Sequence, residues 1–148
     1  MELKFRVWGR IARPVENVFE AVVNPDRLSQ YFTTGGATGR LEKGATVTWD
    51  FADFPGAFPV EVVELVENKL ILLHWGNAEG NGTQTEVTMR FTDCDDGHTL
   101  VEIGETGWSE SQQGLDASYG NCMGWSQMIC TLRIWIEHGI NLREGFYK

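Results

Sequence analysis

The strongest constraint on the fold is one long helical pattern near the end of the chain. Apolar side chains recur there at three- and four-residue intervals, which places them on a single face of a helix. These residues are Trp125, Met128, Ile129, Leu132, Trp135 and Ile136. From about Asp116 the helix would run for more than 20 residues, roughly 30 Å, to a cap at His138-Gly139. An apolar face of that length needs an equally extended apolar surface to cover it.

Most of the preceding sequence predicts a sheet that can supply this surface. Apolar and polar residues alternate in several segments, as they do in half-buried strands. These segments are residues 3–11, 46–51, 58–66, 86–91 and 99–103. A shift of phase at Val63 indicates a bulge, residues 70–75 are apolar on both faces, and Asp96-Gly97 marks a hairpin. We expect six or seven antiparallel strands.

Two short helices should lie between the first strand and the rest of the sheet. Pro14 suits the start of a helix whose apolar stripe includes Val18 and Phe19. Asn24-Pro25 ends it and begins a second helix, with Leu28, Tyr31 and Phe32 as its stripe. A sheet with an apolar face and a long amphipathic helix should pack together, which predicts one α+β domain over residues 1–148.

Charge and composition exclude several classes of function. With 21 Asp and Glu against 12 Lys and Arg, the formal net charge is −9. A chain this acidic repels phosphate backbones, so no nucleic-acid partner is expected. Lys69 and Arg90 are the only bases within residues 44–132. This acidic middle is interpreted either as a solvated sheet face or as a surface that attracts a basic partner.

The cellular compartment is predicted from the absence of a membrane span and a secretory signal and from the spacing of the cysteines. No apolar run approaches the roughly 20 residues that cross a bilayer, so no membrane span is expected. Met1-Glu2-Leu3-Lys4 has none of the features of a secretory signal. Cys94, Cys122 and Cys130 form no C-x-x-C motif and no evident disulfide framework. Such an irregular set suits a reducing cytosol, which predicts a cytoplasmic protein.

Two segments resemble a known family. The opening one is residues 12–21 together with Asn24-Pro25-Asp26-Arg27-Leu28 and Tyr31-Phe32, and the closing one is Gly124-Trp125, Leu132 and residues 135–139. With the order of elements, they resemble the helix-grip fold of the START-like, or SRPBCC, superfamily, which includes the birch pollen allergen. The branch is similar to the C-terminal domain of the activator of the ninety-kilodalton heat-shock protein's ATPase.

Two departures from that branch limit what the resemblance implies. Tyr31 stands where the family usually has Trp, which mainly changes the size of the ring. The eukaryotic activators also carry an N-terminal domain that is missing here, so their co-chaperone activity does not transfer on resemblance alone.

In this fold the first strand lies beside the last, which predicts Lys4 and Arg6 facing outward opposite Glu102.

The resemblance implies a cavity between the curved sheet and the long helix, reached from one end. Strand parity places Trp49, Phe51 and Met89 inward, and the first turns of the long helix usually line the cavity in this superfamily. The candidate ligand-binding residues are Phe32, Trp49, Phe51, Trp75, Met89, Glu105, Trp108, Tyr119, Cys122, Met123 and Ser126. Aromatic and Met side chains suit a hydrophobic ligand. The alternative is that the same side chains fill the core.

Glu105 and His74 are the candidate acid–base groups. If Val101 and Ile103 point inward, period 2 also places Glu105 inward, where it would orient a ligand hydroxyl or act as a general base. Alternatively the strand ends at Gly104 and leaves Glu105 in solvent. Parity cannot place His74, because its strand is apolar on both faces.

Three hypotheses of function remain open. The first is an intracellular protein that binds a small hydrophobic or aromatic molecule. The second is an interaction module that regulates a chaperone ATPase, and the third is a cofactor-free cyclase- or hydratase-type enzyme using Glu105 or His74. No metal, phosphate-loop or nucleophile motif is present, and no cofactor is expected.

Trp8 on the outer face and the two-faced segment 70–75 indicate a covered surface, such as a homodimer interface.

Overall fold

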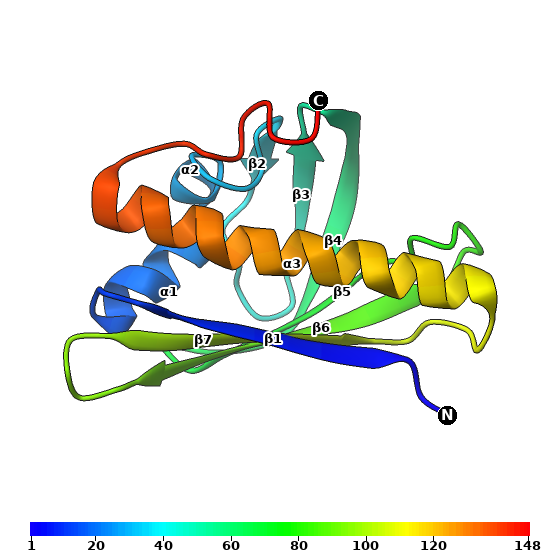
Figure 1. Ribbon diagram of the computed structural model, residues 1–148, viewed down its shortest axis with the longest axis horizontal. Helices are drawn as coiled ribbons and strands as arrows, with labels where there is room; N and C mark the ends of the chain where they lie inside the picture. The colour runs from blue at the N-terminus through cyan, green and yellow to red at the C-terminus, as the bar shows by residue number, and fades with distance from the viewer.

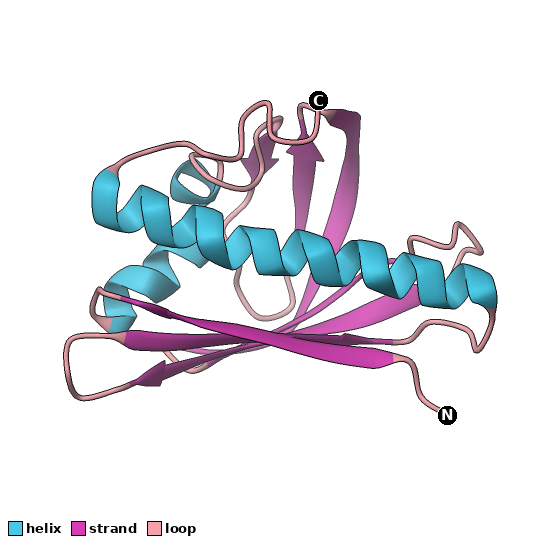
Figure 2. Cartoon of the chain, in the orientation of Figure 1, coloured by secondary structure: helices cyan, strands magenta, loops and turns pink.

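The computed structural model describes residues 1–148 as one long helix lying across a curved antiparallel sheet (Figure 1). The strands are β1 (Lys4–Ile11), β2 (Gly36–Thr38), β3 (Thr46–Phe51), β4 (Phe54–Val66), β5 (Leu70–Gly76), β6 (Gln84–Asp93) and β7 (Thr99–Thr106). The helices are α1 (Val15–Val23), α2 (Pro25–Leu28) and α3 (Gln112–His138). The sheet order is β1-β7-β6-β5-β4-β3-β2. Figure 2 shows the strands in magenta and the helices in cyan. This arrangement confirms the α+β helix-grip fold.

The expected bulge lies in β4, where it helps the sheet to curve. The register against β5 shifts between Val62 and Glu64, and Val63 is exposed. A second irregularity separates Trp49 from Phe51 in β3. Bulges bend a strand and increase its local twist, so the β3–β4 end of the sheet rises away from the β1–β7 end.

The two short helices form as predicted, but the second is shorter than its apolar stripe suggested. Asn24 begins α2, since its Oδ1 accepts hydrogen bonds from the backbone N–H groups of Asp26 and Arg27. The helix ends at Leu28, so Tyr31 and Phe32 lie in the turns that follow it. Tyr31 is nevertheless fully buried, and its hydroxyl donates to the carbonyl of Ala21 at 2.9 Å.

Helix α3 begins four residues earlier than predicted. Ser111 is its cap and accepts a hydrogen bond from the backbone N–H of Gly114 at 3.0 Å. The helix ends at Gly139, whose φ of 71° is the left-handed conformation that glycine favours. None of the helices is both long and apolar enough to span a membrane.

On the outer face, only one of the two expected basic side chains pairs with Glu102. The register sets Glu102 opposite Trp8 and Lys4 opposite Thr106. Arg6 lies opposite Gly104 and reaches diagonally to form the ion pair with Glu102, whereas Lys4 Nζ lies 3.5 Å from the Glu2 carboxylate. The Arg6 guanidinium also lies 4.6 Å from the centre of the Trp8 ring, which is 61% exposed.

Gly9 permits the close approach of α3 to β1. A Cβ atom at this position would lie 2.7 Å from Cγ2 of Ile129, in the middle of the helix. Ile129 is β-branched and buried in the core, so it has little freedom to move aside.

We therefore expect Gly9→Ala to lower the free energy of unfolding by about 1–3 kcal/mol through overpacking. Urea denaturation followed by circular dichroism measures the change. Gly76→Ala is the matched control, since Gly76 also lies in a strand and a Cβ there meets nothing within 4 Å. Equal stability of the two variants would show that α3 does not pack on β1 in this way.

Candidate functional site

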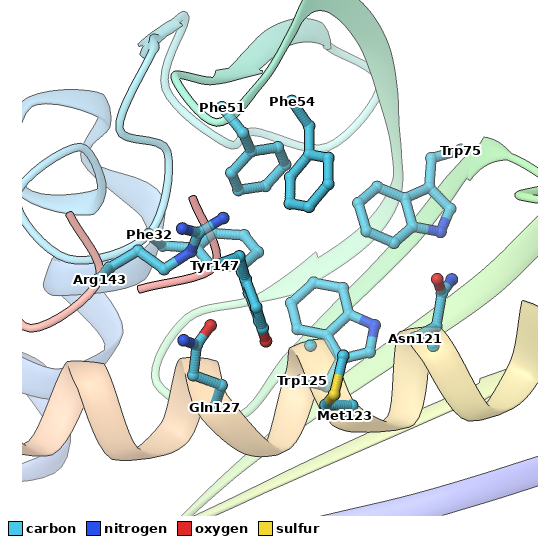
Figure 3. Close-up of a pocket in the computed structure, with 12 residues that line it drawn as sticks. Phe32, Phe51, Phe54, Trp75, Asn121, Met123, Trp125, Gln127, Arg143 and Tyr147 are labelled. Carbon is cyan, nitrogen blue, oxygen red and sulfur yellow. The ribbon is translucent and has the colours of Figure 1, made fainter. Parts of the chain in front are cut away.

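A pocket of about 340 Å³ lies between α3, the β3–β4 turn, β5 and the last residues of the chain (Figure 3). Its lining is mainly apolar, and five of the six aromatic rings in the wall come from Phe or Trp. The lining residues are Phe32, Phe51, Phe54, Trp75, Gly120, Asn121, Met123, Gly124, Trp125, Gln127, Arg143 and Tyr147. The wall therefore suits a small molecule with a largely apolar surface.

The aromatic side chains of the wall pack against one another. Phe32 stacks on Trp125 with ring centres 5.4 Å apart, and it meets Phe51 edge-on at 5.0 Å. Trp75 lies against Trp125 at 5.2 Å. Because each ring is held by a neighbour, the wall keeps its shape without a ligand.

A buried carboxylate behind the wall holds its two indole rings in place. Glu105 is only 2% exposed, and its Oε1 accepts a hydrogen bond from Trp125 Nε1 at 2.7 Å. Its Oε2 accepts from Trp75 Nε1 at 3.0 Å, from Thr85 Oγ1 at 2.6 Å and from Asn121 Nδ2 at 2.9 Å. All these donors are uncharged, so the negative charge is balanced by oriented dipoles rather than by a cation.

Strand β7 continues to Thr106, so Glu105 points inward and the alternative of a solvated side chain is wrong. Both of its oxygens are already hydrogen-bonded, and Glu105 is not part of the pocket lining. Three of its partners, Trp75, Asn121 and Trp125, do line the pocket. The geometry makes Glu105 a residue that positions the wall.

His74 lies on the opposite face of the sheet. Its Nε2 is 3.0 Å from the Glu86 carboxylate on β6, and its side chain is partly exposed. The pocket lies on the inner face with Trp75, the next residue along β5. The two candidate acid–base groups are therefore on different sides of the sheet, and neither lines the pocket.

The structure brings four of the other candidates together in the pocket, namely Phe32, Phe51, Trp75 and Met123. Trp49 and Met89 are buried in the core, and Trp108 is buried against Phe5. Tyr119 (63% exposed), Cys122 and Ser126 lie outside the lining on α3. The helical period explains this, because Gly120, Asn121, Gly124 and Gln127 occupy the face of α3 that turns toward the pocket.

The tail after α3 forms a wall that sequence reasoning missed. Arg143 is 4% exposed and forms two hydrogen bonds with Asp53, Nη1 to Oδ2 at 2.6 Å and Nη2 to Oδ1 at 2.9 Å. Its guanidinium lies over the rings of Phe51 at 5.5 Å and Tyr147 at 4.9 Å. The tail thus turns back at the end of α3 and runs to the β3–β4 turn, as Figure 1 shows. No periodic pattern in residues 140–148 signals these contacts.

A second hollow, of about 850 Å³, adjoins the pocket. The two share Phe51, Phe54, Trp75 and Asn121, and the second extends toward the loop at residues 76–84. A ligand longer than the pocket therefore has room to continue along the inner side of β5. No group of three or more His, Cys, Asp or Glu side chains is arranged to hold a metal ion.

Because Glu105 holds the two indole rings of the wall, Glu105→Gln should strongly lower the free energy of unfolding. The amide keeps the shape but removes the charge and turns an NH₂ group toward existing donors. Because a hydrogen bond to a charged group contributes about 1.5–3 kcal/mol, we expect the free energy of unfolding to fall by more than about 2 kcal/mol in urea denaturation. Glu102→Gln, on the outer face of the same strand, should lose at most about 1 kcal/mol. Similar losses of stability in both variants would show that Glu105 does not hold the wall in place.

The anchor of the tail should depend on pH. Hydrogen bonds from Arg143 hold the pKa of Asp53 below its ordinary value. A carboxyl with a lowered pKa stabilises the fold above its unfolded pKa, and this contribution is lost as the pH falls through the lowered value. NMR order parameters of residues 140–148 should therefore be high at pH 7 and fall only at a pH below the ordinary Asp pKa of about 3.9.

Asp53→Asn should loosen the tail already at pH 7, since it removes the charge that Arg143 binds. Asp96→Asn, which changes an exposed partner of Arg10, should leave the tail ordered. A rigid tail in Asp53→Asn would show that other contacts hold it.

Comparison with solved structures shows the same fold in other proteins. A protein from Staphylococcus saprophyticus superposes with a TM-score of 0.80 at 23% identity, covering 95% of this chain and 96% of its own. The Aha1 dimer of Colwellia psychrerythraea gives a TM-score of 0.78 at 20% identity, covering 93% and 98%. DynU16, from the dynemicin biosynthetic locus, gives 0.78 at 24% identity, covering 92% of this chain and 48% of its own. At these identities the likeness concerns the fold alone.

No functionally curated protein matches the chain. The family described as activator of Hsp90 ATPase homolog 1-like protein matches residues 12–136, which include α1, the whole sheet after β1 and most of α3. This span agrees with the opening and closing segments that carried the resemblance in the sequence. The chain therefore belongs to the family of activator of Hsp90 ATPase homolog 1-like proteins.

Proposed function

We propose that this protein binds a small, largely apolar molecule that contains a ring, in the pocket between α3 and the C-terminal tail. The observation that carries the proposal is a preformed hollow of about 340 Å³ walled by Phe32, Phe51, Trp75 and Trp125. Ligand sites of small molecules have volumes of about 300–1,000 Å³ and are lined mostly by apolar and aromatic side chains. Flat rings stack well on such walls.

Two glycines in α3 support this proposal because they keep the pocket open. Gly120 and Gly124 are one helical turn apart, and both line the pocket. A Cβ atom at either position would meet nothing within 4 Å, so packing does not demand glycine there. Glycine in a helix interior costs about 1 kcal/mol relative to alanine. The helix thus gives up stability at the two places where a side chain would enter the pocket.

Binding is favoured over catalysis because no acid–base candidate faces the pocket. Glu105 is fully hydrogen-bonded behind the wall, and His74 lies on the outer face. The three free thiols, Cys94, Cys122 and Cys130, suit a reducing compartment, and on that ground we place the protein in the cytoplasm.

The family match favours a second candidate, an interaction module for a chaperone ATPase. The exposed Trp8 on the outer sheet face offers one contact surface, and a homodimer would use the same face. Neither interaction needs the pocket. A variant in which the pocket is filled therefore separates ligand binding from these alternatives.

The test is a thermal-shift screen of neutral ring compounds and fatty acids on the wild type and on Gly124→Leu. At a concentration 100 times its Kd, a ligand should stabilise the wild type by about 2.7 kcal/mol. Gly124→Leu should abolish the shift, because its side chain fills the pocket. Without ligand it should be at least as stable as the wild type, since leucine is the better helix former by roughly 0.8–1 kcal/mol.

Ser126→Leu is the matched control, because it adds the same side chain to the exposed face of α3. It should keep the full shift. The proposal fails if no compound stabilises the wild type, or if Gly124→Leu responds as strongly as the wild type does.

A further inference from the structure

Two polar groups in the pocket have no hydrogen-bond partner. Gln127 Nε2, from α3, and the Tyr147 hydroxyl, from the C-terminal tail, are both buried and both unpartnered. Both residues line the pocket. Figure 3 shows the side chain of Gln127 rising from α3 and the hydroxyl of Tyr147 pointing down toward α3, both on the side of the pocket away from Trp75 and Asn121.

Unpartnered buried polar groups are rare in folded proteins, and a specific case calls for an explanation. Other polar side chains of the same two segments do have partners, since Arg143 in the tail and Asn121 in α3 are both hydrogen-bonded. A hydroxyl and an amide N–H are both hydrogen-bond donors. An acceptor atom within hydrogen-bond distance of both groups would satisfy both at once.

The charge of the pocket restricts what that acceptor can be. Arg143 is the only charged side chain in the lining, and its guanidinium is already paired with the Asp53 carboxylate through two hydrogen bonds. Burial raises the pKa of Tyr147, so its hydroxyl keeps the proton that it donates. No uncompensated positive charge is available for a carboxylate or phosphate. The acceptor therefore belongs to a neutral group.

We propose that Gln127 and Tyr147 form the polar end of the site and bind the neutral carbonyl oxygen of a ring-containing ligand, as in an aromatic ketone or ester. The inference rests on the proposed function and adds the chemical class of the ligand to it. It also gives the C-terminal tail a part in selectivity, because the tail supplies Tyr147 and the Arg143–Asp53 pair holds it in place.

Three probes of the same shape test the class. They are 2-acetylnaphthalene, which carries a neutral carbonyl, 2-isopropenylnaphthalene, in which CH₂ replaces the oxygen, and 2-naphthoate, which is charged. Binding is followed through the indole N–H signals of Trp75 and Trp125 in two-dimensional NMR, since both rings line the pocket.

We expect the wild type to bind the ketone about tenfold more tightly than the isopropenyl compound, as two neutral hydrogen bonds predict. Tyr147→Phe and Gln127→Leu should each reduce this preference to about threefold, and the double variant should remove it. The affinity for the isopropenyl compound should stay within about twofold throughout, which shows that the pocket is intact. Tyr119→Phe, an exposed position on α3, is the matched control and should keep the full preference.

Equal binding of the ketone and the isopropenyl compound to the wild type would overturn the assigned class while leaving the proposed function in place. A preference for the ketone that survives the double variant would do the same. Tightest binding of 2-naphthoate would overturn the neutral character of the site. If none of the probes moves the Trp75 and Trp125 signals, the proposed function fails as well.

Discussion

One buried carboxylate joins the long helix to three strands of the sheet beside the pocket. Glu105 on β7 accepts hydrogen bonds from Trp75 on β5, Thr85 on β6, and Asn121 and Trp125 on α3. A buried charge is costly unless it is fully hydrogen-bonded, so the four donors and the carboxylate depend on each other. The consequence is a fixed distance between the sheet and α3 at this point, with two indole rings held at defined orientations between them.

The pocket exists because α3 packs well on one side of this anchor and poorly on the other. Toward β1, its buried residues meet a strand that has glycine at the point of closest approach. Toward β3 and β5, Gly120 and Gly124 leave space, and the aromatic walls do not collapse into it because each ring is held by a neighbour. The tail then covers part of the opening, anchored by a single buried ion pair.

Periodicity in the sequence predicted the parts of the structure that depend on local pattern. It placed β1, β3, β4, β6 and β7, the bulge at Val63 and the core face of α3, because each follows from a two- or 3.6-residue repeat. It left Glu105 either inward or in solvent, and β2 has no repeat that predicts it. His74 escaped prediction, since β5 is apolar on both faces and parity then has no reference. The position of Lys4 depended on the register of β1 against β7, which a repeat does not specify.

Only some of the residues that line the pocket could be predicted from the sequence, for a similar reason. Phe32, Phe51, Trp75 and Met123 were among the candidate ligand-binding residues, and the pocket includes them. Strand parity placed only Phe51 of these four, and Met123 followed from the family resemblance. Tyr119 and Ser126 lie elsewhere because the rotation of α3 about its axis follows from its tertiary contacts. The contact of Arg143 with Asp53 joins residues far apart in the chain with no repeat around either, so only the folded structure reveals it.

The most direct measurement of the central claim is native mass spectrometry of the protein purified from its own host, with the Gly124→Leu variant purified in parallel. A pocket that binds a neutral ring compound predicts a discrete small-molecule adduct on the wild type, which is lost on denaturation and absent from the variant. A wild type that carries no adduct, or an adduct of equal abundance on Gly124→Leu, would contradict ligand binding in this pocket.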